Sequence, residues 1–450
     1  GSMSVLSCLG NGRILSIRDT LYLRSLSQII KVVSTSSTRI SCSFQFQLVL
    51  GQEAGANSNT KTMINTKNAL IGIGSLVTSC VLAAKWYMRP QFPVRSSREN
   101  VASFKSRIGS TTTQTFYPIS SKKSKKKKKS VYIRDRALFG LSKWLHMPSA
   151  ALFFLRNKSH PLEFEVGSPR KDKLPILLFS HGIGGNCEIY SQLCADIADA
   201  GFIVVALEHE DGSASYAMNS NGEEIFYKFP PKDMPYTRNK VVKFREPFFE
   251  QRKREVESAF EHMKMLSESK DATHPFKDIA DVVDFDRVAI GGHSFGGAST
   301  IHLNASSSSS VLKPRCVLLH DPWPFCVSEK DVNQGLNKPT LCMVGDRFRN
   351  SPEYAITEDL IEQTRRKNRV KVYSYHVQGA THSQFSDTPF WLPTPIATPL
   401  PFKLLGKLHD RDLVHDAIVR TTVSFLRHYC YGDDVGDELA TSSPRIISRV

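Results

Sequence analysis

The residues best suited to chemistry surround a single serine. Ser294 lies in the sequence GHSFG (292–296), a G-x-S-x-G motif that follows the apolar run 287–292 and precedes a Gly- and Ala-rich stretch. A strand that turns sharply into a helix presents such a serine as a nucleophile, and small residues on both sides make room for the turn. The positive end of the helix favours negative charge that develops beside it. The motif predicts nucleophilic chemistry at Ser294; the alternative is a Gly-rich turn that happens to contain serine.

A serine nucleophile needs a histidine base and an acid that orients the base. In hydrolases with this motif, the acid and then the histidine follow the serine along the chain. His382 is the best candidate base, because it lies in the loop 379–387 directly after the apolar run 370–376. The other histidines fit other places: the strand for His376, the helix after the nucleophile for His302, and the surface of a C-terminal helix for His409, His415 and His428.

Two aspartates are candidates for the acid. Asp321 ends the apolar run 316–320, and Asp346 ends the apolar run 340–345. Hydrolases of this type use both positions, so the spacing alone leaves the choice open. The aspartate that is not used would serve as an ordinary turn or cap residue.

A glycine-rich loop is the candidate oxyanion hole. Ester cleavage needs backbone N–H groups aimed at the developing oxyanion, each contributing about 2.7–4 kcal/mol. The loop SHGIGG (180–185) follows the apolar run 174–180, and its glycines allow close approach of the backbone. We expect the two donors to be the N–H groups of Ile183 and Phe295. A phosphate-binding loop is the weaker interpretation, because no lysine stands at Walker spacing.

Neither a metal nor a cofactor is predicted. The chain has nine cysteines, none in a CxxC pair, and it contains no HExxH motif. Scattered cysteines in odd number indicate buried free thiols in a reduced protein.

Alternating apolar and polar segments position these residues. Expected strands alternate with expected helices, which predicts an α/β fold with a mostly parallel central sheet and helices on both faces, as in the α/β-hydrolase fold. The catalytic domain is expected over residues 135–430, followed by a C-terminal tail, 431–450. The expected strands are 174–180, 202–208, 287–292, 316–320, 340–345 and 370–376, and the expected helices are 188–200, 246–267 and 412–430.

The N-terminal third differs sharply in charge. Residues 1–134 hold 21 of the 59 Lys and Arg residues and three acids, which accounts for the formal net charge of +16. The remainder is nearly neutral, so we do not expect a nucleic-acid partner. Residues 1–68 are predicted to be a targeting or disordered segment, and 89–134 a basic linker. The lysine run 121–130 suits a solvated linker or contact with anionic lipid headgroups better than nuclear import.

An uncharged run suggests a membrane anchor. Residues 69–84 carry no charge and Lys85, Trp86 and Tyr87 follow them, so 69–88 is a candidate transmembrane or anchor helix. The run is shorter than the roughly 20 residues of a typical span. A signal-peptide core or a buried helix are the alternatives.

Several longer segments resemble one known family. FSHGIGG (179–185), GFIVVALEHEDGSAS (201–215), VAIGGHSFGGAS (288–299), HDPWPF (320–325) and the loop around His382 occur in this order. This set is similar to the single-chain platelet-activating factor acetylhydrolases of the plasma and intracellular type. FGLSKWL (139–145) also resembles the start of their catalytic domain, so the resemblance covers about residues 135–430.

The resemblance implies a function and decides between the two acids. It implies calcium-independent hydrolysis of short or oxidised sn-2 acyl groups on glycerophospholipids, without cofactor or metal. The family's acid precedes a Trp-containing segment, which matches Asp321 and Trp323. The implied partners are a phospholipid and a membrane surface, and the implied location is intracellular and membrane-associated. Other readings are a carboxylesterase or thioesterase, or a non-catalytic binding module on a hydrolase scaffold.

The sequence departs from the family near the expected substrate pocket. Pro322 follows the acid where a small residue is usual, Glu210 stands where an arginine is usual, and the Pro-rich stretch 389–401 looks inserted. These departures concern the acyl and headgroup pocket. A group of apolar residues near the site is expected to touch the bilayer or to pack on the core: Phe390, Trp391, Leu392, Phe402, Leu404 and Leu405.

Overall fold

The structure is a computed structural model of the 450-residue chain. It describes residue 92 and residues 101–120, 131–158, 169–270, 273–305, 311–391, 410–434 and 446–449. The predicted N-terminal segment 1–68 and candidate membrane helix 69–88 lie outside these residues, as does the lysine run 121–130. Within the described ranges, no helix is long and apolar enough to cross a bilayer.

Strands and helices alternate along most of the described chain. The strands are β1 Val101–Ile108, β2 Thr111–Pro118, β3 Leu174–Ser180, β4 Ile203–Glu208, β5 Tyr216–Met218, β6 Glu224–Phe226, β7 Val283–His293, β8 Cys316–His320, β9 Thr340–Gly345, β10 Val372–Val377 and β11 Ile447–Arg449. The helices are α3 Asp135–Trp144, α4 Ser191–Asp199, α5 Arg238–Glu268, α6 Lys277–Ala280, α7 Phe295–Ala305, α8 Glu329–Gln334, α9 Asp346–Arg349, α10 Tyr354–Asn368 and α12 Arg411–Tyr431. Short 3₁₀ helices are η2 Ser149–Leu155, η3 Pro324–Cys326, η4 His382–Phe385 and η5 Thr388–Phe390.

One nine-stranded sheet organises the fold, in the order β1-β2-β4-β3-β7-β8-β9-β10-β11. The six central strands from β4 to β10 pair in parallel, whereas β1, β2 and β11 pair antiparallel at the two edges. The predicted mostly parallel sheet is therefore confirmed. Because the central strands are parallel, their carboxyl ends share one edge of the sheet, where loops can bring distant residues together.

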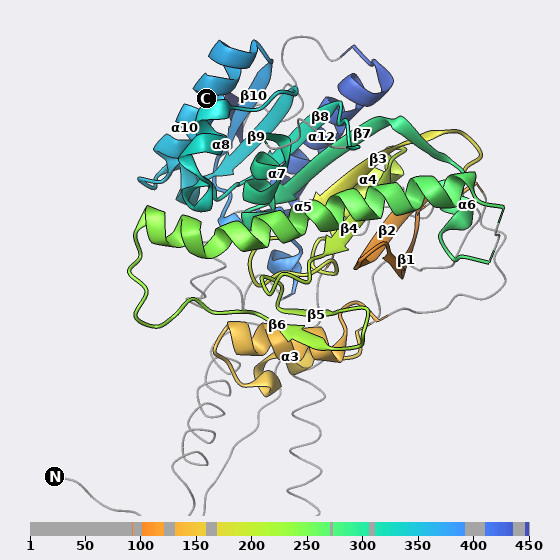
Figure 1. Ribbon diagram of the computed structural model, residues 1–450, viewed down its shortest axis with the longest axis horizontal. Coiled ribbons are helices and arrows are strands. Elements are labelled where there is room, and N and C mark those ends of the chain that lie inside the picture. Colours follow the sequence, from red (N-terminus) through yellow and green to blue (C-terminus); the bar gives the residue numbers. More distant parts are fainter. Residues whose placement is uncertain are drawn as a thin grey trace, which may run out of the picture. The chain divides into compact units, whose positions relative to one another are not determined.

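Helices cover both faces of the sheet, as predicted. Successive side chains of a strand point to opposite faces, and in β3 the residues Ile176 and Leu178 join one apolar cluster while Leu177 and Phe179 join the other. Helices α5, α7 and α10 pack on the first face, and α4 and α12 on the second. Figure 1 shows α5 lying in front of the sheet, with one end below α8 and α10 and the other beside α6.

The prediction that residues 89–134 form a basic linker is wrong for residues 101–118, which form two strands in the structure. Strands β1 and β2 form a hairpin with Ile108 opposite Thr111, and Gly109 takes the left-handed backbone (φ +59°) that the two-residue turn needs. β2 then pairs with β4, so the hairpin extends the sheet. A local strand signal was present beside the lysine run, because most residues of β2 are β-branched or aromatic.

Two further boundaries differ from expectation. Within the predicted tail 431–450, β11 pairs with β10 at the sheet edge, with Tyr375 opposite Arg449. Helix α5 begins at Arg238, earlier than the expected residue 246, and continues through Pro247. A proline inside a helix removes one hydrogen bond and normally marks a boundary. Here burial of Val241 and Phe248 on the sheet side holds the helix together across the proline.

Candidate active site

Ser294 occupies the sharp turn that the motif predicts. β7 ends at His293 and α7 begins at Phe295, so Ser294 alone connects strand and helix, with a left-handed φ of +58°. Its N–H donates to the carbonyl of His320 at 3.0 Å. Such a backbone costs on the order of 1–3 kcal/mol and persists only when the surroundings impose it.

Two glycines allow this turn to pack against β3. A Cβ atom on Gly296 would lie 2.0 Å from the carbonyl oxygen of Ser180, and one on Gly292 would lie 2.4 Å from the carbonyl carbon of Gly296. Neither contact is sterically allowed. The close approach of the turn to the loop after β3 therefore depends on glycine at both positions.

His382 lies between the serine and an aspartate. Its Nε2 is 2.9 Å from Oγ of Ser294, and its Nδ1 is 2.5 Å from Oδ2 of Asp321. The Asp321 side chain is fully buried, and its other oxygen accepts the N–H of Gly345 at 2.8 Å. The structure thus brings the three sequence-predicted residues into one hydrogen-bonded chain, with the serine open to a cavity.

The loop that carries His382 is held by its neighbours. Thr381 and Gln384 cap η4 reciprocally, and the Thr381 N–H donates to the Gln384 side chain at 2.8 Å. The ring of Phe348 stacks on the imidazole with centroids 5.8 Å apart. Because both backbone and ring are restrained, His382 is presented to the serine in one orientation.

Asp346, the second candidate acid, lies in another hydrogen-bonded pair. Its Oδ1 is 2.8 Å from Nε2 of His376 and also accepts the N–H of Gly379 at 3.0 Å. As expected, His376 belongs to strand β10. Asp346 therefore stabilises the turn after β10, and only Asp321 contacts His382.

His293, the variable residue before the nucleophile, has a role that the motif does not reveal. Its Nδ1 accepts the Tyr190 hydroxyl at 2.9 Å, and that hydroxyl accepts the N–H of Gly182 at 2.9 Å. Burial, followed by the nearby His382, holds the pKa of His293 well below its usual value. The neutral ring, 4.5 Å from the His382 ring, links the glycine-rich loop to the nucleophile turn.

The structure decides two expectations about side-chain exposure, and the one for His415 is wrong. His415 was expected at the surface, but it is buried and lies 2.8 Å from Oδ2 of Asp196, because α12 turns this residue toward α4. Phe390 and Trp391 are buried and pack on the core, which is one of the two places expected for them. The remaining residues of that apolar group lie outside the described ranges. His302 lies on α7, as expected, between Asp331 and Glu250.

The predicted oxyanion loop lies against the nucleophile. A Cβ atom on Gly182 would be 3.1 Å from Cβ of Ser294, so the backbone passes directly beside the serine. Ile183 lines the same cavity as Ser294, and Phe295 begins α7 immediately after it. The two predicted donors are thus carried by the two segments that border the serine hydroxyl.

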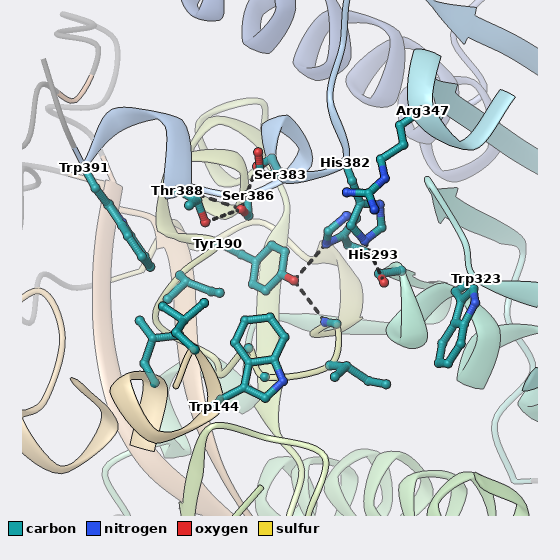
Figure 2. A pocket seen from close by; sticks show the side chains of 18 of the residues that line it. Trp144, Tyr190, His293, Trp323, Arg347, His382, Ser383, Ser386, Thr388 and Trp391 are labelled. Carbon is teal, nitrogen blue, oxygen red and sulfur yellow. Dashed lines mark hydrogen bonds between the residues drawn. The ribbon is translucent and has the colours of Figure 1, made fainter. Parts of the chain in front are cut away.

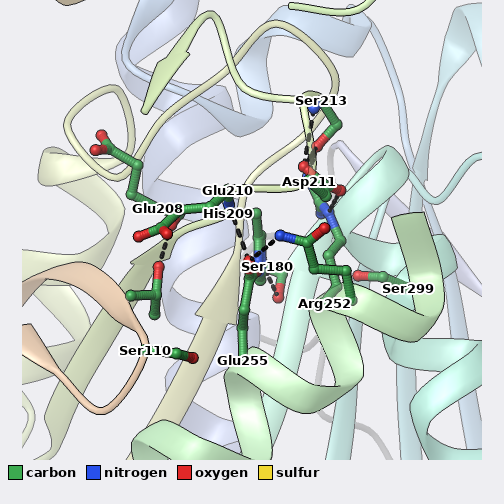
Figure 3. A network of polar contacts seen from close by, with 12 residues as sticks. Ser110, Ser180, Glu208, His209, Glu210, Asp211, Ser213, Arg252, Glu255 and Ser299 are labelled. Atoms are coloured by element: carbon green, nitrogen blue, oxygen red, sulfur yellow. Dashed lines mark hydrogen bonds and ion pairs between the residues drawn. The ribbon is translucent and has the colours of Figure 1, made fainter. Parts of the chain in front are cut away.

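Beneath this loop lies a buried arginine that the sequence analysis missed. Arg252, on α5, donates from Nη1 to the carbonyl of His181 at 2.8 Å and from Nε to Asp211 at 2.9 Å. Nη2 donates to Oγ of Ser213 at 2.6 Å, and the guanidinium lies 4.6 Å from the ring centre of Phe295. Figure 3 shows this residue reaching from the helix toward the end of β4. One side chain therefore contacts both segments that carry the predicted oxyanion donors.

A second group of buried polar side chains stabilises the start of the same loop. His209 lies 2.7 Å from Glu255 through Nδ1 and 3.0 Å from Oγ of Ser180 through Nε2 (Figure 3). Burial and then the charge of Asp211 raise the pKa of Glu255 to about 8, which favours a protonated carboxyl that donates to Nδ1 of His209. Nε2–H is then available for Ser180.

Glu210, which stands where the family usually has arginine, has a local partner. Its Oε1 lies 2.8 Å from Nη2 of Arg107, a residue of β1. Burial and then Glu255 raise the pKa of Glu210 to about 7, although Arg107 opposes the shift. The hairpin that the sequence analysis assigned to a linker therefore supplies the cation at this position.

The serine opens into a cavity of about 590 Å³ whose walls differ in character. Figure 2 shows Trp144 and Trp391 on one side, Trp323 on the other, and His293 and His382 between them. The first side is apolar and includes Leu141, Trp144, Leu145, Leu152, Phe154 and Trp391. The second side combines aromatic, polar and charged residues: Tyr236, Trp323, Arg347, Ser351 and Glu353.

Among the described residues, one group could offer metal ligands. His293, Asp321 and His382 place ligand atoms within 4.8 Å of one another. In the structure, however, Nδ1 of His293 accepts from Tyr190, and Asp321 and His382 bind each other. A metal there would have to replace these hydrogen bonds, so we assign none to the site.

Comparison with known proteins places the chain in a family. The family model described as platelet-activating factor acetylhydrolase, isoform II, matches residues 100–440. The chain belongs to this family. The match begins at β1, which agrees with the hairpin being part of the domain.

Two relatives of the platelet-activating factor acetylhydrolase family show the extent of the similarity. The chain is 29% identical to a platelet-activating factor acetylhydrolase of Cavia porcellus over 283 residues, which is 58% of this chain and 59% of that protein. It is 27% identical to the protein of that name from Canis lupus familiaris, over 65% of this chain and 66% of that one. The chain thus matches 59% and 66% of the length of these two relatives.

A solved structure supports the fold. A ferulic acid esterase from Streptomyces cinnamoneus superposes with a TM-score of 0.56 at 16% identity, covering 80% of this chain and 99% of that structure. At this level of identity the similarity concerns only the arrangement of the sheet and helices.

Proposed function

We propose that this member of the platelet-activating factor acetylhydrolase family is a serine esterase that hydrolyses short or oxidised sn-2 acyl esters of glycerophospholipids, independently of calcium. One observation carries the proposal: Ser294, His382 and Asp321 form a hydrogen-bonded chain, with 2.9 and 2.5 Å contacts, at the wall of a largely apolar cavity. Membership of the family and the printed names of the relatives favour a phospholipid ester as substrate.

The proposed mechanism uses groups that the fold already holds in place. Ser294 Oγ attacks the ester carbonyl while Nε2 of His382 takes its proton. Asp321, buried and bonded to Nδ1, keeps the imidazole in the correct tautomer and stabilises the imidazolium. His382 then gives the proton to the leaving glycerol oxygen, and water cleaves the acyl-enzyme by the reverse sequence of proton transfers.

The N–H groups of Ile183 and Phe295 are proposed to bind the oxyanion. Such donors act without reorganisation when their backbone is already fixed. Arg252 restrains both segments, through the His181 carbonyl and the Phe295 ring. The positive end of α7 adds a favourable field at the same point.

The apolar side of the cavity is proposed to receive the acyl chain. Buried Phe154 and Trp391 stand among its lining residues. A volume of about 590 Å³ is typical of a site for a small ligand. A short or oxidised sn-2 chain fits such a space, whereas most of a long-chain lipid would have to remain outside.

We also propose that the protein acts at an intracellular membrane surface. The uncharged run 69–84 and the lysine run 121–130 support this location, because the first could anchor the chain and the second attracts anionic headgroups. Flotation of the full chain with anionic vesicles, and its loss after the lysines at 122–129 are replaced by glutamine, would test the contribution of the lysine run.

The proposed activity is tested with two measurements on the purified chain. A fluorophosphonate probe should label the wild type and the control Ser267→Ala, whose serine lies on α5 away from the cavity, but should not label Ser294→Ala. Phosphatidylcholines with sn-2 chains of increasing length should show a rate that falls with length and is unaffected by a calcium chelator. Labelling of Ser294→Ala, or turnover of simple esters without turnover of any phospholipid, would contradict the proposal.

A further inference from the structure

A buried carboxylate joins the loop of His382 to the start of helix α4. Asp387 follows His382 in that loop and is only 1% exposed. Its Oδ2 accepts the N–H of Ser191 at 2.9 Å and its Oδ1 accepts the N–H of Gln192 at 3.0 Å, although 196 and 195 positions separate the partners. In return, the Asp387 N–H donates to the carbonyl of Ile189 at 2.8 Å. The two segments are therefore bonded in both directions.

This carboxylate serves as the cap of α4. Tyr190 stands at the N-cap position of the helix, and its side chain makes no capping hydrogen bond. The first N–H groups of a helix have no partner within the helix, and negative charge is favoured beside them. Because Asp387 satisfies two of these groups from a distant loop, a shift of the loop would uncover the helix end, and a shift of the helix would release the loop.

A third segment fixes the orientation of the carboxylate. The Tyr132 hydroxyl donates to Oδ2 of Asp387 at 3.0 Å and accepts the indole N–H of Trp391 at 3.0 Å. Burial and then Asp387 raise the pKa of Tyr132 well above its usual value, so the hydroxyl keeps the proton that it donates. Asp387 is thus held by three hydrogen bonds from two separate parts of the chain.

The start of α4 leads directly to the oxyanion loop. Tyr190 immediately precedes this helix, and its hydroxyl accepts the N–H of Gly182, the residue before the proposed oxyanion donor Ile183. Figure 2 shows the same hydroxyl pointing toward His293, to which it donates. Asp387 therefore binds segments that lead to the proposed base and to one proposed oxyanion donor, although it does not line the cavity itself.

We propose that Asp387 is a positioning residue that couples the catalytic base to the oxyanion loop. Through its carboxylate, the loop of His382 and the contact of Tyr190 with the glycine-rich loop keep a fixed relation to each other. A displacement of about 1 Å between groups that act on the same carbonyl costs about 100-fold in rate. The inference rests on the proposed esterase function and adds to it a residue that does not contact the reacting atoms.

Asp387→Asn tests this role, because an amide has one acceptor oxygen where the carboxylate has two. Its NH2 group would face the N–H of Ser191 or Gln192, so the loop and the helix would separate. We expect kcat for p-nitrophenyl acetate to fall about 100-fold while KM changes less than about threefold, since the cavity remains but the alignment is lost. The far-downfield proton NMR signal of the hydrogen bond between His382 and Asp321 should also shift, which a loss of stability alone would not cause.

Asp196→Asn is the matched control. Asp196 is also a buried carboxylate on α4, and its Oδ2 lies 2.8 Å from Nε2 of His415. This variant should keep the kcat and the NMR signal of the wild type, measured at a temperature at which thermal melts show both variants to be folded. An equal loss of kcat in the two variants, or an unchanged signal in Asp387→Asn, would overturn the positioning role.

A measurement on the wild type covers the case in which Asp387→Asn does not fold. Coupling between two sites is reciprocal, so a fluorophosphonate bound to Ser294, whose phosphoryl oxygen would occupy the proposed oxyanion hole, should slow deuterium exchange of the Ser191 and Gln192 amides. The amides of α10 provide the control and should exchange at the same rate with and without the probe. Unchanged exchange at Ser191 and Gln192 would contradict the coupling.

The outcomes also separate this proposal from the esterase function. If the wild type hydrolyses the ester and Asp387→Asn is equally fast, only the positioning role is wrong. If the wild type neither hydrolyses the ester nor reacts with the probe, the esterase function fails and the positioning role fails with it.

Discussion

Arg252 donates a 2.8 Å hydrogen bond to the main-chain carbonyl of His181, although 71 positions separate the two residues. The same guanidinium lies over the Phe295 ring and pairs with buried Asp211. A helix residue that does not line the cavity therefore restrains the glycine-rich loop and the start of α7 together. Catalysis through a fixed oxyanion hole depends on such restraint, because a small displacement of the donors weakens transition-state binding.

The first prediction follows from this arrangement. Arg252→Met should lower kcat by about 100-fold, because the two segments that carry the donors lose their shared restraint. It should also reduce stability by about 3–5 kcal/mol, since Asp211 is left as a buried unpaired charge. The double variant Arg252→Met/Asp211→Asn separates the two effects: denaturant titration should show stability recovered while kcat stays low. Recovery of kcat along with stability would mean that Arg252 has only a structural role.

The choice of acid provides a second prediction. Asp321→Asn should reduce kcat by about 10⁴-fold, because the amide favours the wrong imidazole tautomer of His382. Asp346→Asn should leave kcat close to that of the wild type, because Asp346 binds His376 and not His382. Steady-state kinetics with a p-nitrophenyl ester, alongside a thermal melt of each variant, are sufficient. The assignment fails if Asp346→Asn is the more damaging change.

The third prediction concerns pH and stability. Burial and Asp211 raise the pKa of Glu255 from 4.5 to about 8. Between those values the folded state binds more protons than the unfolded state, so this group makes the free energy of unfolding fall as pH rises from about 4.5 to about 8. Glu255→Gln keeps a donor for His209 and should reduce the loss of thermal stability between pH 5 and pH 9.

Glu261→Gln is the matched control for that measurement, since Glu261 is an exposed residue of the same helix. Its melting temperature should follow the wild type across the pH range. If the thermal stability of Glu255→Gln and Glu261→Gln depends on pH in the same way, Glu255 does not hold a proton in the folded protein at neutral pH.

The fourth prediction tests the packing of the nucleophile turn. Gly296→Ala should destabilise the protein by about 3 kcal/mol or more, because the added methyl group would lie 2.0 Å from the Ser180 carbonyl oxygen. Gly222→Ala is the comparison for backbone strain without a contact: its φ is left-handed, at +81°, and nothing lies within 4 Å of the added atom, whereas Gly296 is a residue of helix α7 without a positive φ. The control should cost only about 1–2 kcal/mol. If Gly296→Ala costs no more stability than Gly222→Ala in urea titration, the contact with the Ser180 carbonyl does not determine the effect at Gly296.

Several features of the fold follow from local sequence. The parallel sheet and its helices could be predicted because apolar strands and helices alternate along the chain, and the nucleophile turn because its strand, glycines and helix are contiguous. The β1–β2 hairpin carried β-branched residues and a turn glycine, but the adjacent lysine run dominated the interpretation. Helix α5 extends through Pro247 because its apolar side is buried. This burial depends on the tertiary structure, so the sequence around Pro247 could not predict it.

By itself the sequence determined the type of sheet, the position of Ser294 at a strand-to-helix turn and the two aspartates that could assist it. Asp321 and Asp346 end neighbouring parallel strands, so they arrive at one edge of the sheet and sequence spacing cannot separate them. Only the tertiary structure brought Asp321 to His382, through the left-handed backbone of Asp321 and the course of the loop after β10. It also brought Arg252 to His181 and Asp387 to Ser191. Such contacts depend on how elements distant along the chain pack together, and no local pattern encodes that packing.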